Sequence, residues 1–314
     1  MNAKPLADSA EITYTIIIPH RNIPQLLQRC LDSIPYREDV QIIIVDDNSD
    51  PEMVDFNAFP GAERKGVEIV YTRESRICRG ENGKGYFTKK GKGPGYARNV
   101  ALQKAQGKWI VFADADDFFY EGMLQILDAW KDSKYDIVFF DFASIDAETL
   151  ERCVETEYIK AYPFEIWRYI VWVSWSKLIR SELIRSHSLA FDERWGADDV
   201  MFNIRCGMHA RTVAKSSALL YHYVVRGSSI SKSTDYDYVF DNLEVGIQMN
   251  KIYYKHKIPF LQFTLGDVLF LKESPYYWKA WRYYLIHGHK IIIAKELIEA
   301  IKYRITHRWL ANLV

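Results

Sequence analysis

The sequence predicts an α/β fold, in which helices flank a mostly parallel, mixed sheet and a helical extension follows at the C-terminal end. Over about residues 12–145, short β-branched apolar runs alternate with helical patterns, which is typical of parallel strands covered on both faces. Residues 146–232 are less periodic and rich in Trp and Tyr, and residues 233–314 have a helical pattern. Since 48% of the 314 residues are hydrophobic, the chain can bury a substantial core.

The first two predicted elements are a strand and a helix. The run Thr15–Ile18 is β-branched and stops at Pro19, as expected of a strand. Asn22 is a suitable cap for the next helix, and Pro24 falls in its first turn, where proline is tolerated. The apolar residues that follow at helical spacing are Leu26, Leu27, Cys30, Leu31 and Ile34.

Three further strands and one helix follow along the chain. Gln41–Val45 and Val67–Tyr71 have the apolar composition of buried strands, and Trp109–Ala113 is the fourth strand. The segment Gly95–Gln106 has a helical pattern and is followed directly by a glycine, a residue that commonly ends helices.

Polar side chains stand at the ends of three of these strands. They are the segments 19–22 (Pro-His-Arg-Asn), 46–50 (Asp-Asp-Asn-Ser-Asp) and 114–117 (Asp-Ala-Asp-Asp). Ligands of parallel sheets bind beyond the carboxyl ends of the strands. We therefore expect the three segments to meet at one binding site.

Asp114 and Asp116 directly follow the fourth strand, so their carboxylates need a cation or a solvated turn, because unpaired charge beside a core is costly. Mg²⁺ and Mn²⁺ prefer hard oxygen ligands and are commonly held by one or two carboxylates together with substrate phosphates. The alternative is an acidic turn in which Asp117 caps the next helix. Because two other polar strand ends are expected nearby, we favour the metal site.

Two side chains are candidates for contact with a nucleotide. Asp47 could accept hydrogen bonds from a base or a ribose, but its segment could equally form an Asx-turn. Arg98 lies near the start of a predicted helix, where helix N–H groups and a cation favour an anion. We favour a site role for Arg98. The preceding Gly- and Lys-rich stretch, Arg79–Gly95, is predicted to be a mobile loop whose lysines are solvated.

Two further positions allow a catalytic and a structural interpretation. Asp198 and Asp199 precede an apolar pattern that predicts a helix, so they could stabilise its N-terminus, or one could act as a general base. His222 alternates with aromatic residues and could be a strand-face histidine, or a further metal ligand beside the aspartates.

Composition narrows the class of protein. Lys plus Arg equals Asp plus Glu, at 41 each, so no overall charge indicates a nucleic-acid partner. The four cysteines are scattered, which is typical of a reducing compartment. The N-terminal residues lack the apolar stretch of a signal peptide, and no apolar run approaches the roughly 20 residues that span a bilayer. We expect a cytoplasmic protein.

The C-terminal tail leaves a peripheral membrane position open. Tyr276–Tyr284 and the later stretch through Arg304 to Trp309 combine basic and aromatic residues. Such helices can lie in an anionic membrane interface, or can pack their aromatic side on the α/β domain.

Taken together, these motifs resemble the family 2 glycosyltransferases of the Rossmann-like GT-A fold. The resemblance covers about residues 14–232, and the order and spacing of its motifs make it specific. The segments that carry it are Ile16–Asn22, Val45–Asp50, Gly95–Asn99, Trp109–Asp117, Trp175–Leu178, Ala197–Phe202 and Ser228–Ser231. It implies a glycosyltransferase domain over residues 12–232, with a nucleotide-binding half (12–117) and an acceptor half (118–232), and a helical extension over 233–314.

On the donor side, the resemblance implies that Pro19, Arg21 and Asn22 shape the nucleotide pocket. Asp47 would contact the base, and Arg98 would contact the ribose or the diphosphate of a nucleotide-sugar.

On the catalytic side, the resemblance implies that Asp116 is the main ligand of a Mn²⁺ or Mg²⁺ ion, with Asp114 between the metal and the nucleotide. Asp199 would be the catalytic base, and Asp198 would stand beside it at the nucleotide-sugar. His222 falls where some members have a further metal ligand.

The implied reaction is inverting transfer of a sugar, with a UDP-sugar favoured as donor, to a hydroxyl of a glycan or polyprenyl-linked glycan in bacterial surface-polysaccharide assembly. One alternative is a non-catalytic nucleotide-sugar-binding or scaffold module. Another is a sugar nucleotidyltransferase, which would need a Gly-rich phosphate loop where Pro19–Asn22 stands.

Overall fold

The computed structural model describes residues 11–72, 92–153, 162–194, 196–226, 236–258 and 275–295, with residue 298 and the short segments 78–79 and 85–86. The chain divides into two compact units, residues 1–228 and 229–314, and each is described by itself. The predicted domain boundary between residues 232 and 233 lies outside the described residues.

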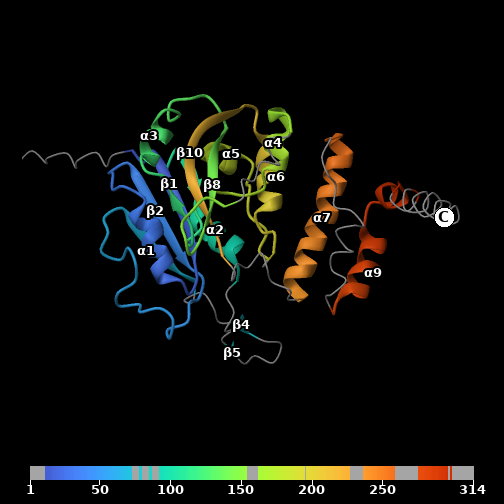
Figure 1. The fold of residues 1–314 in the computed structure, drawn as a ribbon, viewed down its shortest axis with the longest axis horizontal. Helices are drawn as coiled ribbons and strands as arrows, with labels where there is room; N and C mark the ends of the chain where they lie inside the picture. The colour runs from blue at the N-terminus through green and yellow to red at the C-terminus, as the bar shows by residue number, and fades with distance from the viewer. Residues whose placement is uncertain are drawn as a thin grey trace, which may run out of the picture. The chain divides into compact units, whose positions relative to one another are not determined.

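Within the described residues, the first unit contains an eight-stranded sheet (Figure 1). Its spatial order is β3 (Val67–Tyr71), β2 (Val40–Asp46), β1 (Tyr14–His20), β6 (Trp109–Phe112), β9 (Lys177–Arg180), β8 (Ile137–Asp146), β10 (Val213–Val225) and β7 (Phe118–Phe119). β1 pairs in parallel with β2 and β6, β2 with β3, and β8 with β10, whereas β9 and β7 are antiparallel to their neighbours. The predicted mostly parallel, mixed sheet is confirmed. β4 (Cys78–Arg79) and β5 (Gly85–Tyr86) form a separate antiparallel pair.

Helices flank this sheet, as the sequence predicts. They are α1 (Pro24–Asp32), α2 (Pro94–Leu102), α3 (Met123–Asp128), α4 (Phe164–Ile170), α5 (Ser181–Ser186) and α6 (Val200–His209). α1 and α3 share a buried core with one face of the sheet, to which Ile16 and Val111 contribute. Phe112 points to the other face, where its ring contacts Phe191 and Phe202, the latter on α6.

Two local predictions are wrong. The helix predicted to run to Gln106 ends at Leu102. Asn22 does not cap α1, since Ile23 occupies the N-cap position and Asn22 has a left-handed backbone with φ of 60°. Most of the Gly- and Lys-rich segment before α2 lies outside the described residues.

The second unit contains α7 (Tyr236–His256) and α9 (Tyr277–His287), which pack together through Leu243, Ile247 and Tyr284. The helical extension was predicted from this region, while the basic and aromatic stretch from Arg304 lies outside the described residues. Among the helices described in either unit, none is both long and apolar enough to cross a membrane.

Candidate active site

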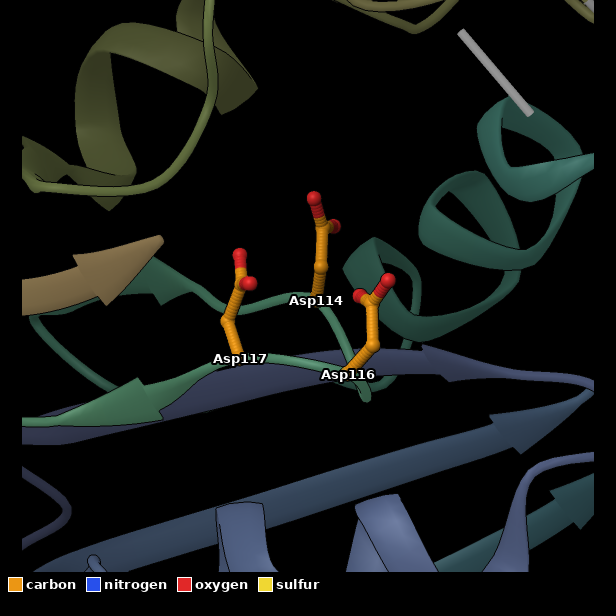
Figure 2. Close-up of side chains that lie close together, drawn as sticks. All are labelled: Asp114, Asp116 and Asp117. Atoms are coloured by element: carbon orange, nitrogen blue, oxygen red, sulfur yellow. The ribbon is translucent and has the colours of Figure 1, made fainter. Parts of the chain in front are cut away.

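Three aspartates gather in one group directly after β6 (Figure 2). Asp114, Asp116 and Asp117 each offer one carboxylate oxygen, and these oxygens lie within 4.8 Å of one another. Ala115, between the first two, is only 3% exposed and belongs to the core. The structure therefore brings the two predicted metal ligands, Asp114 and Asp116, together and adds Asp117 to them.

β10 holds this aspartate cluster in place. The Asp114 N–H donates to the hydroxyl of Tyr221 at 2.8 Å, and Asp117 Oδ1 accepts from the N–H of Val224 at 2.8 Å. The Asp117 N–H also donates to the Asp114 carbonyl at 3.1 Å, which closes a tight turn. Asp117 thus anchors the loop to a strand and does not cap a helix, because α3 begins after Gly122.

Burial and mutual repulsion disfavour the charged forms of these carboxylates. Burial raises the pKa of Asp116, and Asp114 raises it further, while Arg226 lowers it. Burial also raises the pKa of Asp117 well above its ordinary value, and its two acidic neighbours add to the effect. Asp117 Oδ2 is buried and lacks a hydrogen-bond partner within the described parts of the chain. A divalent cation would relieve this repulsion, so the all-oxygen donor set fits Mg²⁺ or Mn²⁺.

Two arginines compensate part of the negative charge. Arg226, directly after β10, forms an ion pair with the carboxylate of Asp116. Arg29 of α1 donates to the backbone carbonyl of Asp116 at 2.6 Å. Asp116 is therefore held through both its side chain and its main chain.

Arg98 of α2 joins the aspartate cluster to the second acidic pair. Its Nη2 lies 2.6 Å from Asp114 Oδ1, and its Nη1 lies 2.6 Å from Asp198 Oδ2. The Arg98 side chain is 6% exposed, so this is a nearly buried bridge. We predicted an anion at Arg98, and in the structure the anions beside it are the chain's own carboxylates.

Asp199 occupies the N-cap position of α6, but its side chain makes no capping hydrogen bond. Burial raises the pKa of Asp199; Arg98 lowers it and Asp114 raises it. Burial likewise raises the pKa of Asp198 to about 7, against the opposing charge of Arg98. A carboxylate whose pKa is raised toward neutrality is suited to general base catalysis.

The predicted base contact, Asp47, is occupied by the chain's own donors. Its carboxylate accepts from the Thr72 hydroxyl at 3.1 Å and from the backbone N–H groups of residues 92–93 at 3.0 and 2.8 Å. Asp47 therefore ties the start of α2 to the end of β2. The Asx-turn considered for this segment forms at Asp50, whose Oδ1 accepts from the Glu52 N–H at 3.0 Å. Asp46 Oδ2 accepts from the Ser49 N–H at 3.1 Å.

The polar ends of β1 and β2 lie side by side, as predicted. Asn22 Oδ1 accepts from the Asp50 N–H at 2.7 Å, and the Asn22 N–H donates to the Ser49 hydroxyl at 2.8 Å. Pro19 and Arg21, which precede Asn22, are both half-buried. The structure thus places these three predicted nucleotide-binding residues together at the end of β1, with Pro19 in the strand and Arg21 and Asn22 directly after it.

The structure does not bring His222 into the aspartate cluster. Its ring stacks on that of Phe118, with centroids 4.7 Å apart, and lies 5.4 Å from the ring of Tyr120. Burial lowers its pKa, and Arg152 lowers it further. Within the described residues, the group that could hold a metal ion contains carboxylates alone. The structure therefore agrees with the interpretation of His222 as a strand-face histidine.

Comparison with known proteins identifies the family. A sequence model described as glycosyl transferase family 2 matches residues 15–184, more than half of the chain. This chain belongs to glycosyl transferase family 2. It is 25% identical over 229 residues to a poly(ribitol-phosphate) beta-glucosyltransferase of Bacillus spizizenii, covering 71% of this chain and 34% of that protein. It is 22% identical over 230 residues to the poly(ribitol-phosphate) beta-N-acetylglucosaminyltransferase TarS of Staphylococcus aureus, covering 71% and 37%.

Solved structures agree on the fold of this family 2 chain. The crystal structure of S. aureus TarS 1–349 in complex with UDP-GlcNAc superposes with a TM-score of 0.59 at 20% sequence identity, covering 76% of this chain and 65% of that one. The GT-A fold predicted from the resemblance is thereby confirmed. The chain spans only about a third of the length of the two curated relatives named above.

Sequence reasoning missed three contributors to the family 2 site. The sequence suggests Asp117 as a helix cap, although its place directly after Asp116 is a signal that it could join the cluster. Tyr221 and Arg226 stand more than 100 positions later in the chain, and no motif links them to the aspartates. The antiparallel pairing of β10 with β7, which directly follows Asp117, brings them close.

Proposed function

We propose that this chain transfers a sugar from a nucleotide-diphosphate sugar to a hydroxyl group of a glycan acceptor, with inversion at the anomeric carbon. The observation that carries the proposal is the continuous array in which Arg98 joins the aspartate cluster to Asp198, next to Asp199, in a family 2 chain. This array provides carboxylates for a cation on one side and a carboxylate with a raised pKa on the other.

Asp116 and Asp114 would hold a Mn²⁺ or Mg²⁺ ion, with Asp117 completing the group of oxygens. When bound, the cation would neutralise the diphosphate of the leaving nucleotide and act as a Lewis acid. Arg226, which pairs with Asp116, is placed to exchange that carboxylate for a phosphate oxygen, since arginine suits both partners.

Asp199 is the proposed catalytic base. Its raised pKa makes it a better proton acceptor than an exposed aspartate, and it would take the proton of the acceptor hydroxyl as that oxygen attacks the anomeric carbon. The attack comes from the face opposite the leaving group, so one displacement inverts the configuration. Arg98 would keep Asp198 and Asp114 in place on either side of the reacting groups.

A UDP-sugar is the favoured donor. The structure of TarS that superposes on this chain holds UDP-GlcNAc, and the end of β1 with Pro19, Arg21 and Asn22 is proposed to border the nucleotide. The two relatives are named for transfer to poly(ribitol-phosphate), a polymer, which supports a glycan or lipid-linked glycan as acceptor.

The second unit is proposed to contact the membrane that carries such an acceptor. On α9, Trp278 is 79% exposed and Ile286 is 61% exposed, and the basic residues Lys279 and Arg282 are exposed between them. Exposed aromatic and basic residues on one helix suit an anionic interface. Trp278→Glu should abolish sedimentation with vesicles that contain anionic lipid, whereas Tyr254→Glu, at an exposed site on α7, should not. Equal sedimentation of both variants and the wild type would count against the contact.

The central experiment measures release of UDP from a panel of UDP-sugars in the presence of glycan acceptors. We expect turnover with Mn²⁺ or Mg²⁺ that EDTA abolishes, and losses of roughly 10²–10⁴-fold in Asp199→Asn. Asp116→Ala should lose the metal response, and Asp132→Asn, whose side chain is 82% exposed, is the matched control.

Full activity of both site variants would refute the proposal. Binding of the nucleotide-sugar without turnover, including hydrolysis, would instead favour the non-catalytic module. Stereochemistry of the product, followed by NMR of the anomeric proton, tests the inversion separately.

A further inference from the structure

A cavity of about 210 Å³ lies on β8, and the proposed mechanism does not use it. The sheet is incomplete beside it. β9 pairs with β8 only as far as Phe139, and the pairing of β8 with β10 shifts register around Leu219, opposite Asp141. Bulges of this kind often stand next to active sites, because they interrupt the ladder and redirect side chains. We name this space the β8 cavity.

The β8 cavity combines flat apolar rings with a few polar groups. Its lining includes the aromatic residues Phe142, Trp167 and Trp175 and the polar residues Asp141 and Ser217. Such a combination matches a sugar ring, whose C–H face packs on aromatic rings and whose hydroxyl groups need hydrogen-bond partners. The volume far exceeds the roughly 10–15 Å³ that one water requires, yet is below the ~300–1,000 Å³ of sites for larger ligands. It suits a single ring.

One wall of the β8 cavity leads to the aspartate cluster. The Trp175 ring stacks on that of Tyr221, with centroids 5.1 Å apart and an angle of 13° between the rings. The Tyr221 hydroxyl accepts the hydrogen bond from the Asp114 N–H. A ring bound against Trp175 is thus separated from the loop of the proposed metal ligands by one aromatic side chain.

The same wall leads to the proposed base. Val173 and Trp175 line the cavity, whereas Ser174 between them is buried and accepts a hydrogen bond from Asn203 Nδ2 at 3.0 Å. Asn203 Nδ2 also donates to the carbonyl of Asp199 at 2.9 Å. Asn203 therefore connects the cavity-lining segment 173–175, through two hydrogen bonds, to the backbone of Asp199, the residue proposed to deprotonate the acceptor hydroxyl.

We infer that the β8 cavity binds one pyranose ring of the acceptor, next to the site of transfer. The inference rests on the proposed function for the identity of the ligand as an acceptor. Aromatic contacts would select a ring with an apolar face, and Asp141 would select hydroxyl groups. The nucleotide-sugar donor is proposed to bind outside this cavity, at the aspartate cluster.

Saturation-transfer NMR with methyl pyranosides of glucose, galactose and N-acetylglucosamine tests the inference on the full chain, without metal or nucleotide. Ser217 is exposed, so Ser217→Trp can fill the cavity from its rim, and Ser186→Trp on α5 is the matched control. We expect at least one pyranoside to bind, Ser217→Trp to weaken it tenfold or more, and the control to leave it unchanged. Asp141→Asn, nearly isosteric, should weaken it several-fold even if the larger substitution perturbs folding.

Asp116→Ala separates this inference from the proposed function. It removes a proposed metal ligand, so donor turnover should fail while pyranoside binding persists. Absence of pyranoside binding by the wild type would overturn the inference, as would binding that Ser217→Trp and Asp141→Asn leave intact. Loss of binding in Asp116→Ala alone would place the sugar in the donor site and would overturn it equally. Failure of donor turnover in the wild type would refute the proposed function but leave this binding test valid.

Discussion

Replacing Arg98 by methionine should destabilise the first unit far more than removal of an ordinary surface arginine. Arg98 bridges Asp114 and Asp198 at 2.6 Å on each side, and its side chain is 6% exposed. Methionine keeps much of the aliphatic length but removes the charge and both hydrogen bonds. Because the Asp198 side chain, which is 10% exposed, stays behind in a nearly dry site, the variant contains an uncompensated buried charge.

The magnitude follows from burial. Breaking a buried ion pair from one side costs about 3–5 kcal/mol, whereas an exposed pair contributes about 0.2–1 kcal/mol. Arg37 provides the comparison within the chain, since it also bridges two aspartates, Asp39 and Asp128, but its side chain is 31% exposed. We therefore expect Arg98→Met to lower the free energy of unfolding by about 3–5 kcal/mol and Arg37→Met by about 1 kcal/mol or less.

The effect should also depend on pH. Burial raises the pKa of Asp198 in the folded state to about 7, although Arg98 opposes the rise. Without Arg98 this pKa would be higher still, so the folded variant would keep losing stability as pH rises above 7, where the wild type has levelled off. The difference in the free energy of unfolding between Arg98→Met and the wild type should therefore be larger at pH 8.5 than at pH 6, because Asp198 is protonated in both proteins at pH 6.

Urea denaturation monitored by tryptophan fluorescence measures these differences. If the free energy of unfolding falls by about 3 kcal/mol per M of urea, Arg98→Met should lower the urea concentration at the unfolding midpoint by about 1–2 M. An equal shift for Arg98→Met and Arg37→Met would refute the reasoning from burial. A difference that shrinks with rising pH would refute the assignment of the charge on Asp198.

Three further predictions concern single positions. Tyr221→Phe should lower the free energy of unfolding by about 1–3 kcal/mol, because it leaves the buried Asp114 N–H without its acceptor; urea denaturation beside Tyr36→Phe, an exposed control, measures this. The rate of transfer should fall with decreasing pH at a midpoint above 3.8, since Asp199 must be ionised and burial raises its pKa; a profile flat down to pH 4 would contradict the assignment. Gly207→Ala should destabilise by about 1–3 kcal/mol or more, because an added Cβ would lie 1.7 Å from a carbonyl oxygen of α4, and thermal unfolding detects the loss.

The fold could be predicted largely because its strands are apolar on both faces. Ile16, Ile17 and Ile18 are all fully buried, which is why a continuous β-branched run indicated a parallel strand covered on both sides. The ends of elements were harder. Residues 103–106 continue the helical pattern of α2, yet the helix ends at Leu102, since local propensity does not determine where tertiary packing ends a helix.

The site was predictable where neighbours in sequence are neighbours in space. Asp114 and Asp116 flank a buried alanine, so alternation alone placed them together. The partners that hold them were not predictable, because Arg226 follows β10, more than 100 positions later in the chain, and Arg98 pairs in the structure with carboxylates. A motif indicates which groups carry charge, whereas the fold determines which charges meet.

Charge balance gives the last prediction, which concerns the order of binding. The segment 114–117 contributes three carboxylates and the pair 198–199 two, against the three guanidinium groups of Arg29, Arg98 and Arg226. With all five carboxylates ionised, these described residues carry two excess negative charges, so a diphosphate would enter an unfavourable field unless a divalent cation came with it. In thermal unfolding, UDP alone should therefore raise the midpoint temperature little, and UDP with Mn²⁺ should raise it by more than the sum of the separate shifts.

Because binding free energies are reciprocal, UDP should tighten Mn²⁺ binding by the same factor by which Mn²⁺ tightens UDP binding, and calorimetry measures both. Equal stabilisation by UDP with and without the cation would show that the arginines alone suffice for the diphosphate, and the aspartate cluster would then need another role.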